Sequence, residues 1–425
     1  MNKIGIMTFH KSINYGSVLQ AYALQQAVNK LGFSSEVIDY EPDNYKYLYG
    51  YFRIPKNSTN IKHDIINLRN LPLLMRRRKK FAEFRNTSLK MSSKQYKFGN
   101  KMDDLDNDYN FVICGSDQIW NPKAKDSDVN YFLPNSLNIK KISYAVSLND
   151  GGASEFDDAQ QYKKYLMDFD ALSVREQSGK TELEKFLENK KTVEVVLDPS
   201  LLHKKETYYP ICSERIIKQP YIFFYSVNHN KSTIEAVNIL SKRLNLPVYY
   251  LYTNTSTRRT YKTYPEFEYM KHDVAPQDFI SLIRYADFVI TDSFHGTAFS
   301  IAFEKKFYSI GKTDSEGKKI RDERICNILA SLGIEDRFIT QTDAESVDFA
   351  DIDYKDVNAK REALIELSLG YLKDALLSQF SLDNRYITPK SPTFDWQICK
   401  SDDCTGCFSN ERDINEHLKK SFKKI

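Results

Sequence analysis

Short apolar runs alternate with longer amphipathic stretches through residues 1–375. The first unit is clear: residues 3–9 (KIGIMTF) have the pattern of a buried strand, and the stretch from Ser17 keeps one apolar face until Gly32 ends it. Residues 36–40 (EVIDY) then return to a strand pattern. Repeated strand–helix–strand units build a parallel sheet covered by helices, so the pattern predicts a doubly wound α/β fold.

The alternation of strand and helix patterns occurs in two successive series along the chain, which predicts two domains. A polar and basic insertion at residues 42–105, expected to contain a helix over residues 61–84, interrupts the first series. A polar segment with two prolines at residues 203–219 separates the two series. Two Rossmann-like domains facing a cleft resemble the architecture called GT-B among glycosyltransferases. The predicted units are an N-terminal domain at residues 1–210, a C-terminal domain at residues 211–382 and a C-terminal extension at residues 383–425.

Length and charge narrow the function classes. A chain of 425 residues exceeds the usual limit for one hydrophobic core. Its net charge of +4 comes from 61 basic and 57 acidic residues, a balance that argues against a nucleic-acid-binding protein. The chain has no apolar run of eighteen residues and begins with a strand pattern rather than a signal peptide, so we expect a cytoplasmic protein.

One local segment departs from this balance. Residues 71–81 (LPLLMRRRKKF) join an apolar patch to five consecutive cations. A solvated helix start and a dock on an anionic membrane surface explain the segment equally well.

The cysteines give little reason to expect a metal. There are six, and a reduced state is the default for a cytoplasmic protein. Cys399, Cys404 and Cys407 have a spacing that could serve zinc or an iron-sulfur cluster, but a fourth ligand is missing nearby. We therefore favour an ordinary reduced tail and expect no metal or cofactor.

Candidate chemistry lies in strand-to-helix turns, because the carboxyl ends of parallel strands face the ligand crevice. In the first turn, Gly16 lets the backbone approach a ligand and Ser17 begins a helix whose N-terminus favours an anion, although a merely tight turn explains Gly16 equally well. In the second, Asp117 could accept a sugar proton and Trp120 could stack on a sugar, but a cap and a core residue are the favoured alternative.

Two further turns carry charged or titratable groups. Arg175 follows an apolar strand and could bind a carboxylate or phosphate, or simply pair with Glu176. Residues 291–300 (TDSFHGTAFS) place Ser293 and His295 after another strand, and structural and catalytic roles for this histidine are evenly balanced.

Five segments, in this order and at this spacing, resemble the polysaccharide pyruvyl transferase family over residues 1–335: NYGSVLQAYALQ (14–25), CGSDQIWN (114–121), SVREQSG (173–179), VLDPSLL (196–202) and TDSFHGTAFSIAF (291–303). The resemblance implies transfer of pyruvate from phosphoenolpyruvate to two hydroxyls of one sugar, giving a cyclic ketal and phosphate. The implied acceptor is a hexose such as galactose in a precursor of a bacterial cell-surface polysaccharide, often lipid-linked. The segment at residues 71–81 would then dock the enzyme at the inner face of the membrane.

The resemblance also implies roles for the candidate residues. His295 would donate a proton or assist the departure of phosphate, and Asp117 would orient or deprotonate the acceptor. The remaining donor-binding candidates are Arg175, Ser293, Gly296, Lys312 and Arg324, although a solvated charged face is the simpler account of the last two. The acceptor-binding candidates are Asn14, Tyr15, Gly16, Ser17, Gln118 and Trp120.

Two other functions fit the same sequence. A nucleotide-sugar glycosyltransferase could use the same paired domains and the same histidine turn, and it would bind UDP rather than phosphoenolpyruvate. A non-catalytic or redox-linked protein would instead use the C-terminal cysteines.

Overall fold

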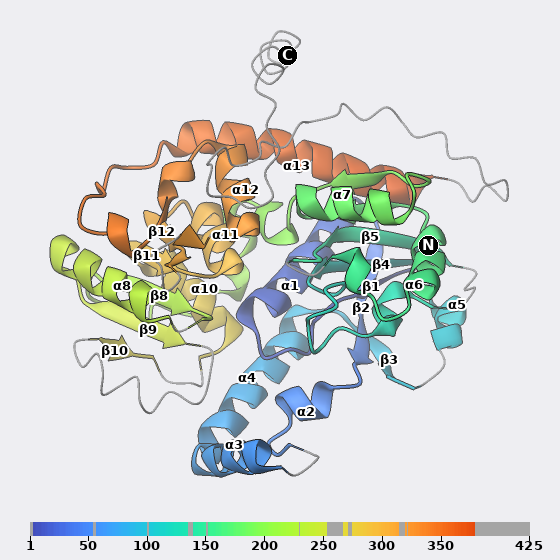
Figure 1. Ribbon diagram of the computed structural model, residues 1–425, viewed down its shortest axis with the longest axis horizontal. Helices are drawn as coiled ribbons and strands as arrows, with labels where there is room; N and C mark the ends of the chain where they lie inside the picture. The colour runs from blue at the N-terminus through green and yellow to red at the C-terminus, as the bar shows by residue number, and fades with distance from the viewer. Residues whose placement is uncertain are drawn as a thin grey trace, which may run out of the picture.

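The structure is a computed structural model that describes residues 3–378 except 54–56, 100–101, 135–138, 150–151, 229, 253–266, 271–273, 314–318 and 321. The predicted extension at residues 383–425, with Cys399, Cys404 and Cys407, lies outside the described residues. Figure 1 shows two sheet-containing units side by side, with one long helix running across both.

The first unit is built on a parallel sheet of seven strands in the order β3-β2-β1-β4-β5-β6-β7. Every residue of the two central strands β4 and β5 is buried, as expected for parallel strands covered on both faces. The strands are β1 (Lys3–Met7), β2 (Ser34–Glu41), β3 (Met91–Lys97), β4 (Phe111–Asp117), β5 (Lys140–Val146), β6 (Leu172–Val174) and β7 (Val193–Val195). Its helices are α1 (Tyr15–Lys30), α5 (Leu105–Asp108), α6 (Ala159–Met167) and α7 (Gln177–Phe186).

The second unit repeats the plan with a parallel sheet in the order β10-β9-β8-β11-β12-β15. Its strands are β8 (Ile222–Ser226), β9 (Val248–Tyr252), β10 (Glu268–Tyr269), β11 (Phe288–Thr291), β12 (Phe307–Ile310) and β15 (Phe338–Ile339), beside a small antiparallel pair of β13 (Lys312–Thr313) and β14 (Lys319–Ile320). Its helices are α8 (Lys231–Leu244), α10 (Pro276–Tyr285), α11 (Phe294–Ala302) and α12 (Glu323–Leu332). The predicted α/β fold with two Rossmann-like halves is confirmed.

The insertion after β2 differs from its prediction. It contains α2 (Tyr45–Tyr49), α3 (Ser58–Arg69) and α4 (Leu71–Ser88), and then β3, which pairs with β2 as an edge strand. The single helix expected over residues 61–84 is therefore divided, because Asn70 ends α3 and Pro72 occupies the first turn of α4. Proline cannot donate a helix hydrogen bond, so it is tolerated in a first turn but not in a helix interior.

One helix, α13 (Tyr354–Leu377), joins the two units. Near its start the Tyr354 hydroxyl donates to the carbonyl of Lys305 (2.5 Å) in the second unit. Near its end the Tyr371 hydroxyl donates to the carbonyl of Ser143 (2.8 Å) in β5 of the first unit. The helix therefore constrains how far one unit can move relative to the other. Among the residues that the structure describes, no helix combines the length and the hydropathy needed to cross a bilayer.

Candidate active site

The first helix of the chain meets His295 of the second unit where the two units face each other. Asn14 caps α1, and its side chain accepts from the backbone N–H of Gly16 at 2.9 Å. A Cβ placed on Gly16 would lie only 2.2 Å from Nδ1 of His295. Only glycine therefore allows α1 to approach the imidazole this closely.

His295 owes its position to the turn between β11 and α11. Ser293 is the N-cap of α11, and its hydroxyl accepts from the Gly296 N–H at 3.5 Å. A Cβ on Gly296 would lie 2.2 Å from Oγ1 of Thr291, so this glycine is needed for packing the helix onto the end of the strand. The Asp292 carboxylate accepts from Ser226 and from backbone N–H groups after β8. Of this polar group, His295 is the side chain best placed for chemistry.

Asp117 lies on the opposite side of the same meeting point. It ends β4 with a left-handed backbone conformation (φ 71°), and its Oδ2 accepts from the Ser17 hydroxyl at 2.5 Å. Neighbouring residues of α1 therefore contact the two candidate groups, since Gly16 packs on His295 while Ser17 bonds to Asp117. The N-terminus of α1 therefore contacts both His295 and Asp117 and places them in the same region.

A buried ion cluster centred on Asp198 completes the region. Asp198 accepts from Arg175 Nη1 at 2.8 Å and from the Ser116 hydroxyl at 3.0 Å. Arg175 also donates from Nε to Glu176 at 3.1 Å. Asp198 caps the short helix η4 (Pro199–Leu201), which packs against both α1 and α11. The cluster is thus held where the first unit contacts the second.

Two buried nitrogen atoms in this cluster have no hydrogen-bond partner among the described residues. His295 Nε2 lies 3.9 Å from Asp198 Oδ2, beyond hydrogen-bond distance. Within the described part of the chain, neither His295 Nε2 nor Arg175 Nη2 has a hydrogen-bond partner. Buried polar atoms without partners are costly, and they are common where a substrate completes the site.

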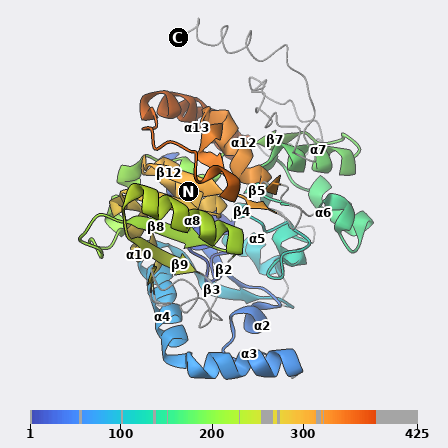
Figure 2. The same ribbon diagram turned by 60° about the vertical axis from the view of Figure 1, so that its left-hand side comes forward.

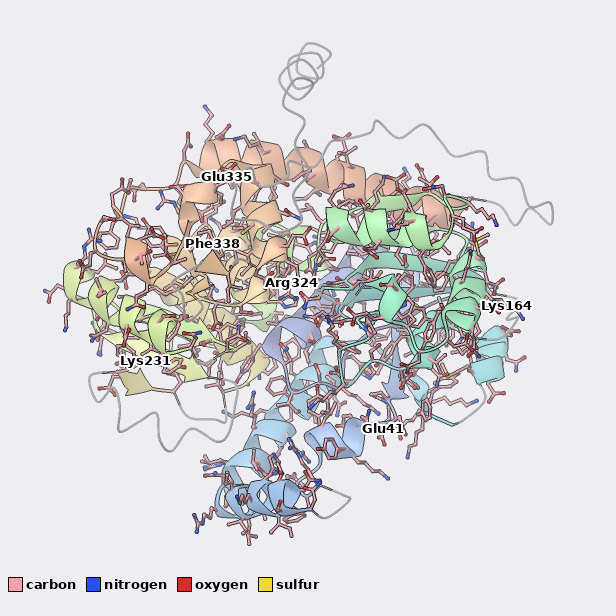
Figure 3. All side chains as sticks on the ribbon, viewed as in Figure 1. Glu41, Lys164, Lys231, Arg324, Glu335 and Phe338 are labelled. Carbon is pink, nitrogen blue, oxygen red and sulfur yellow. The ribbon has the colours of Figure 1, made fainter. Side chains whose placement is uncertain are left out.

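A small pocket is lined by Arg175 and Asp198 of this cluster. Arg175 lies over the ring of Phe294 at 4.2 Å, and a second guanidinium, that of Arg324, pairs with Asp322 through two bonds of 2.9 and 2.5 Å. Figure 3 places Arg324 between the two units. The pocket is lined by Arg175, Val196, Leu197, Asp198, Leu201, Phe294, Arg324, Asn327 and Ile328. Both guanidinium groups already face carboxylates, and Arg175 Nη2 is the buried guanidinium nitrogen on this pocket that has no hydrogen-bond partner among the described residues.

Burial and charge set the ionisation of the cluster. Burial lowers the pKa of His295 below its usual value, so the free imidazole is neutral at neutral pH. Burial acts to raise the pKa of Asp198, but attraction to His295 and Arg175 outweighs it and the pKa is lowered. Because the attraction to His295 requires a protonated ring, Arg175 is the partner that keeps Asp198 ionised at neutral pH. Burial raises the pKa of the Glu176 carboxyl despite its contact with Arg175.

The structure places two of the acceptor-binding candidates in the core, as the favoured alternative had it for Trp120. Trp120 is fully buried, stacks on Phe132 at 5.1 Å and donates to a backbone carbonyl, so it fills the core. Tyr15 is also fully buried and stacks on Phe279 of α10 at 5.0 Å. Both rings are covered by other side chains and are not available to stack on a sugar.

The remaining candidates fall into three groups. Gly16, Ser17, Asp117, Arg175 and His295 come together at the meeting point of the units, with Arg324 on the adjoining pocket. Gln118 accepts from the side chain of Asn121 at 2.8 Å just beyond Asp117. Lys312 lies in β13, and its side chain is outside the described residues.

The sequence reasoning named Glu176 only as a partner of Arg175, a contact that the structure contains, and it missed Asp198 and Ser116. Asp198 had a usable signal, since it follows an apolar run and precedes a proline in VLDPSLL. Its link to Arg175 could not be read from spacing, because the side chains meet only when β6 and β7 pair in parallel.

The chain is similar to known proteins in sequence and in fold. A sequence model of the family described as "Polysaccharide pyruvyl transferase" matches residues 14–313. No curated protein matches the sequence. Similar solved structures include the UDP-GlcNAc 2-epimerase of Methanocaldococcus jannaschii (11% identity, 85% of this chain and 92% of that chain, TM-score 0.43).

Two further solved structures are similar. They are the UDP-GlcNAc 2-epimerase of Neisseria meningitidis (11% identity, 88% and 94% covered, TM-score 0.41) and CalG4, the calicheamicin glycosyltransferase (11% identity, 88% and 96% covered, TM-score 0.41).

Proposed function

The chain belongs to the polysaccharide pyruvyl transferase family, and we propose that it transfers pyruvate from phosphoenolpyruvate to two hydroxyls of one sugar, forming a cyclic ketal and releasing phosphate. The proposed acceptor is a hexose such as galactose in the precursor of a cell-surface polysaccharide.

The proposal rests on one observation: two buried nitrogen atoms, Arg175 Nη2 and His295 Nε2, have no hydrogen-bond partner in the described part of the chain, and the guanidinium of Arg324 lines the adjoining pocket. Phosphoenolpyruvate carries a carboxylate and a phosphate on adjacent atoms. The planar fork of an arginine matches either group. One small anion with two such groups would satisfy donors that otherwise remain buried without partners.

The reaction requires one proton at carbon and one at phosphate. The methylene carbon of phosphoenolpyruvate takes up a proton, which leaves the neighbouring carbon electrophilic. The first sugar hydroxyl adds to that carbon, the carbon–oxygen bond to phosphate breaks, and phosphate leaves with the electron pair. The second hydroxyl then forms the second bond of the ketal. The two hydroxyl protons released balance the proton gained by the methyl group and the proton gained by phosphate.

His295 is suited to the proton transfers. Its buried imidazole is neutral in the free protein because burial lowers its pKa. A bound phosphate or carboxylate favours the imidazolium, so the donor itself would charge the group that later gives up the proton. Asp198, 3.9 Å away, would stabilise that charge.

The acceptor would enter from the side of Asp117. This carboxylate is oriented by the Ser17 hydroxyl at 2.5 Å and can take a proton from a sugar hydroxyl. The insertion helix α2 borders the same region, since Tyr49 donates to Asp126 at 2.8 Å and both groups interact electrostatically with Asp117. We assign the acceptor subsite to this side, with Tyr49 in place of Tyr15 and Trp120.

Ligand-induced stabilisation tests the donor. Phosphoenolpyruvate should raise the melting temperature of the full chain, and UDP should not. An Arg175→Lys variant should lose most of this shift, because lysine keeps the charge but not the planar fork. Stabilisation by UDP, with none by phosphoenolpyruvate, would favour a nucleotide-sugar glycosyltransferase and contradict the proposal.

A further inference from the structure

The insertion projects two helices away from both sheets. Figures 1 and 2, turned by 60° from each other, both place α3 at the outer end of α4, at the lower edge of the molecule. The second half of α4 is anchored to the body, where Phe81 and Phe84 are buried. The first half of α4 and all of α3 extend beyond that anchor.

The outer face of α3 carries an apolar stripe. Ile61, Ile65 and Leu68 are 48%, 48% and 60% exposed, and their spacing of four and three residues puts them on one side of the helix. Nine large hydrophobic side chains are exposed in the described part of the chain, and five of them lie between residues 52 and 75: Phe52, Ile61, Ile65, Leu68 and Met75. Scattered apolar residues are ordinary on protein surfaces, whereas a gathered set marks an interaction site.

Positive charge surrounds the stripe. Residues 58–82 contain seven lysines and arginines and one aspartate, a net charge of +6, whereas the whole chain has +4. The rest of the chain is therefore net negative, and the positive charge is concentrated here. Lys62 and Arg69 are exposed beside the stripe on α3, and Arg76 and Lys79 are exposed on α4.

The cation run at residues 71–81 contributes only in part. Arg77 is 4% exposed, donates to the Ile13 carbonyl at 3.2 Å and lies over the ring of Tyr15. Lys80 pairs with Asp278 of α10 at 3.6 Å. These two residues hold α4 to the body, so the surface available to a partner lies mainly on α3, which the sequence pattern did not single out.

We propose that Ile61, Ile65, Leu68 and Met75, together with Lys62, Arg69, Arg76 and Lys79, form a docking face for an anionic lipid bilayer. An apolar stripe beside exposed cations on one helix suits a helix lying in the interface, with its apolar side chains among acyl chains and its cations at the headgroups. Four apolar side chains are few for a stable protein partner, which typically requires about 800 Å² from each side. This inference is independent of the proposed reaction.

Cosedimentation of the full chain with vesicles tests the proposal. Phosphatidylcholine vesicles with added phosphatidylglycerol should bind the protein, pure phosphatidylcholine vesicles should bind it at least tenfold more weakly, and raised salt should weaken the binding. The triple variant Ile61→Ser, Ile65→Ser, Leu68→Ser should lose binding at least tenfold. The variant Lys62→Gln, Arg69→Gln should lose the preference for phosphatidylglycerol.

A matched control separates this face from general surface hydrophobicity. Phe98 and Ile216 are 41% and 46% exposed elsewhere, and replacing both by serine should leave vesicle binding unchanged. Circular dichroism should report the same helix content for every variant. The proposal is overturned if wild-type protein ignores phosphatidylglycerol, if the triple variant binds as well as wild type, or if the triple substitution instead abolishes a dimer seen by size-exclusion chromatography.

Discussion

The missing Cβ of Gly16 determines how closely the two units approach each other at His295. A methyl group there would lie 2.2 Å from the imidazole Nδ1, so a Gly16→Ala variant must displace either the ring or α1. We expect its kcat/KM for phosphate release to fall by more than tenfold although no reactive atom is removed. Steady-state assays of phosphate release measure this.

A second helical glycine supplies the control. A Cβ on Gly179 of α7 would have its nearest neighbours at 3.6 Å, an ordinary contact, so Gly179→Ala should keep wild-type activity. Wild-type activity in Gly16→Ala would show that the contact with Gly16 does not position His295.

Asp198 should matter for both stability and donor binding. Asp198→Asn removes the charge that faces the buried Arg175. Breaking a buried ion pair on one side typically costs about 3–5 kcal/mol. Denaturant unfolding should report a loss of this order, and calorimetry should report weaker phosphoenolpyruvate binding.

The exposed pair of Lys204 with Glu362 offers a comparison, since the two side chains are 71% and 57% exposed. Glu362→Gln should cost about 1 kcal/mol or less and leave donor binding intact. Equal losses of stability and of donor binding in the two variants would show that Asp198 matters no more than an exposed carboxylate.

Donor binding should be linked to proton uptake at His295. Burial lowers the pKa of the free imidazole, and a bound anion raises it. Between these two pKa values the complex holds one more proton than the free protein, so the Kd for phosphoenolpyruvate should fall as pH decreases through that window and level off below it. Calorimetry in buffers of different ionisation enthalpy measures the proton directly.

A His295→Gln variant corrects for titration of the donor phosphate itself. The proton uptake seen in wild type should be reduced in this variant. Identical proton uptake in both proteins would show that the ligand, and not His295, takes up the proton.

At the scale of elements, α13 supports the site through one hydroxyl. Ser368 is buried, and its Oγ accepts from the backbone N–H of Leu197, the neighbour of Asp198, at 2.9 Å. Ser368→Ala leaves that N–H without this partner, and a cost of about 1–3 kcal/mol is expected from thermal or denaturant unfolding.

Gly370 on the same helix should respond with the opposite sign. A Cβ there meets nothing within 4 Å, and alanine stabilises a helix interior by roughly 0.5–1 kcal/mol relative to glycine. Gly370→Ala should therefore raise the melting temperature. A loss of stability in Gly370→Ala, or none in Ser368→Ala, would contradict this view of α13.

Hydrophobic pattern predicted the elements that are apolar throughout and failed where side chains face solvent. The strands β1, β4 and β11 were found because they are buried almost completely. The edge strand β3 was missed because Ser92, Ser93, Lys94 and Gln95 give its sequence MSSKQYK the polarity of a loop. The stripe on α3 escaped notice since three apolar residues among polar ones gave no reason to look there.

At the scale of the whole molecule, the sequence predicted the turns that carry the site but not how they combine. Arg175 and His295 were chosen because each follows a buried strand. Asp198 meets Arg175 through the parallel pairing of β6 with β7, and it approaches His295 through the contact of η4 with α11 of the other unit. Such contacts depend on how the two sheets pack together, and no local pattern encodes that.

The central claim is ketal transfer, and analysis of the sugar product tests it most directly. Wild-type protein and His295→Ala would be incubated with phosphoenolpyruvate and a panel of β-galactosides and lipid-linked oligosaccharides, with phosphate assays and mass spectrometry. We predict acceptor-dependent phosphate release and, in equal amount, a sugar heavier by one pyruvate less one water, both lost in the variant. A panel without any pyruvylated product, together with glycosyl transfer from a UDP-sugar, would contradict the account.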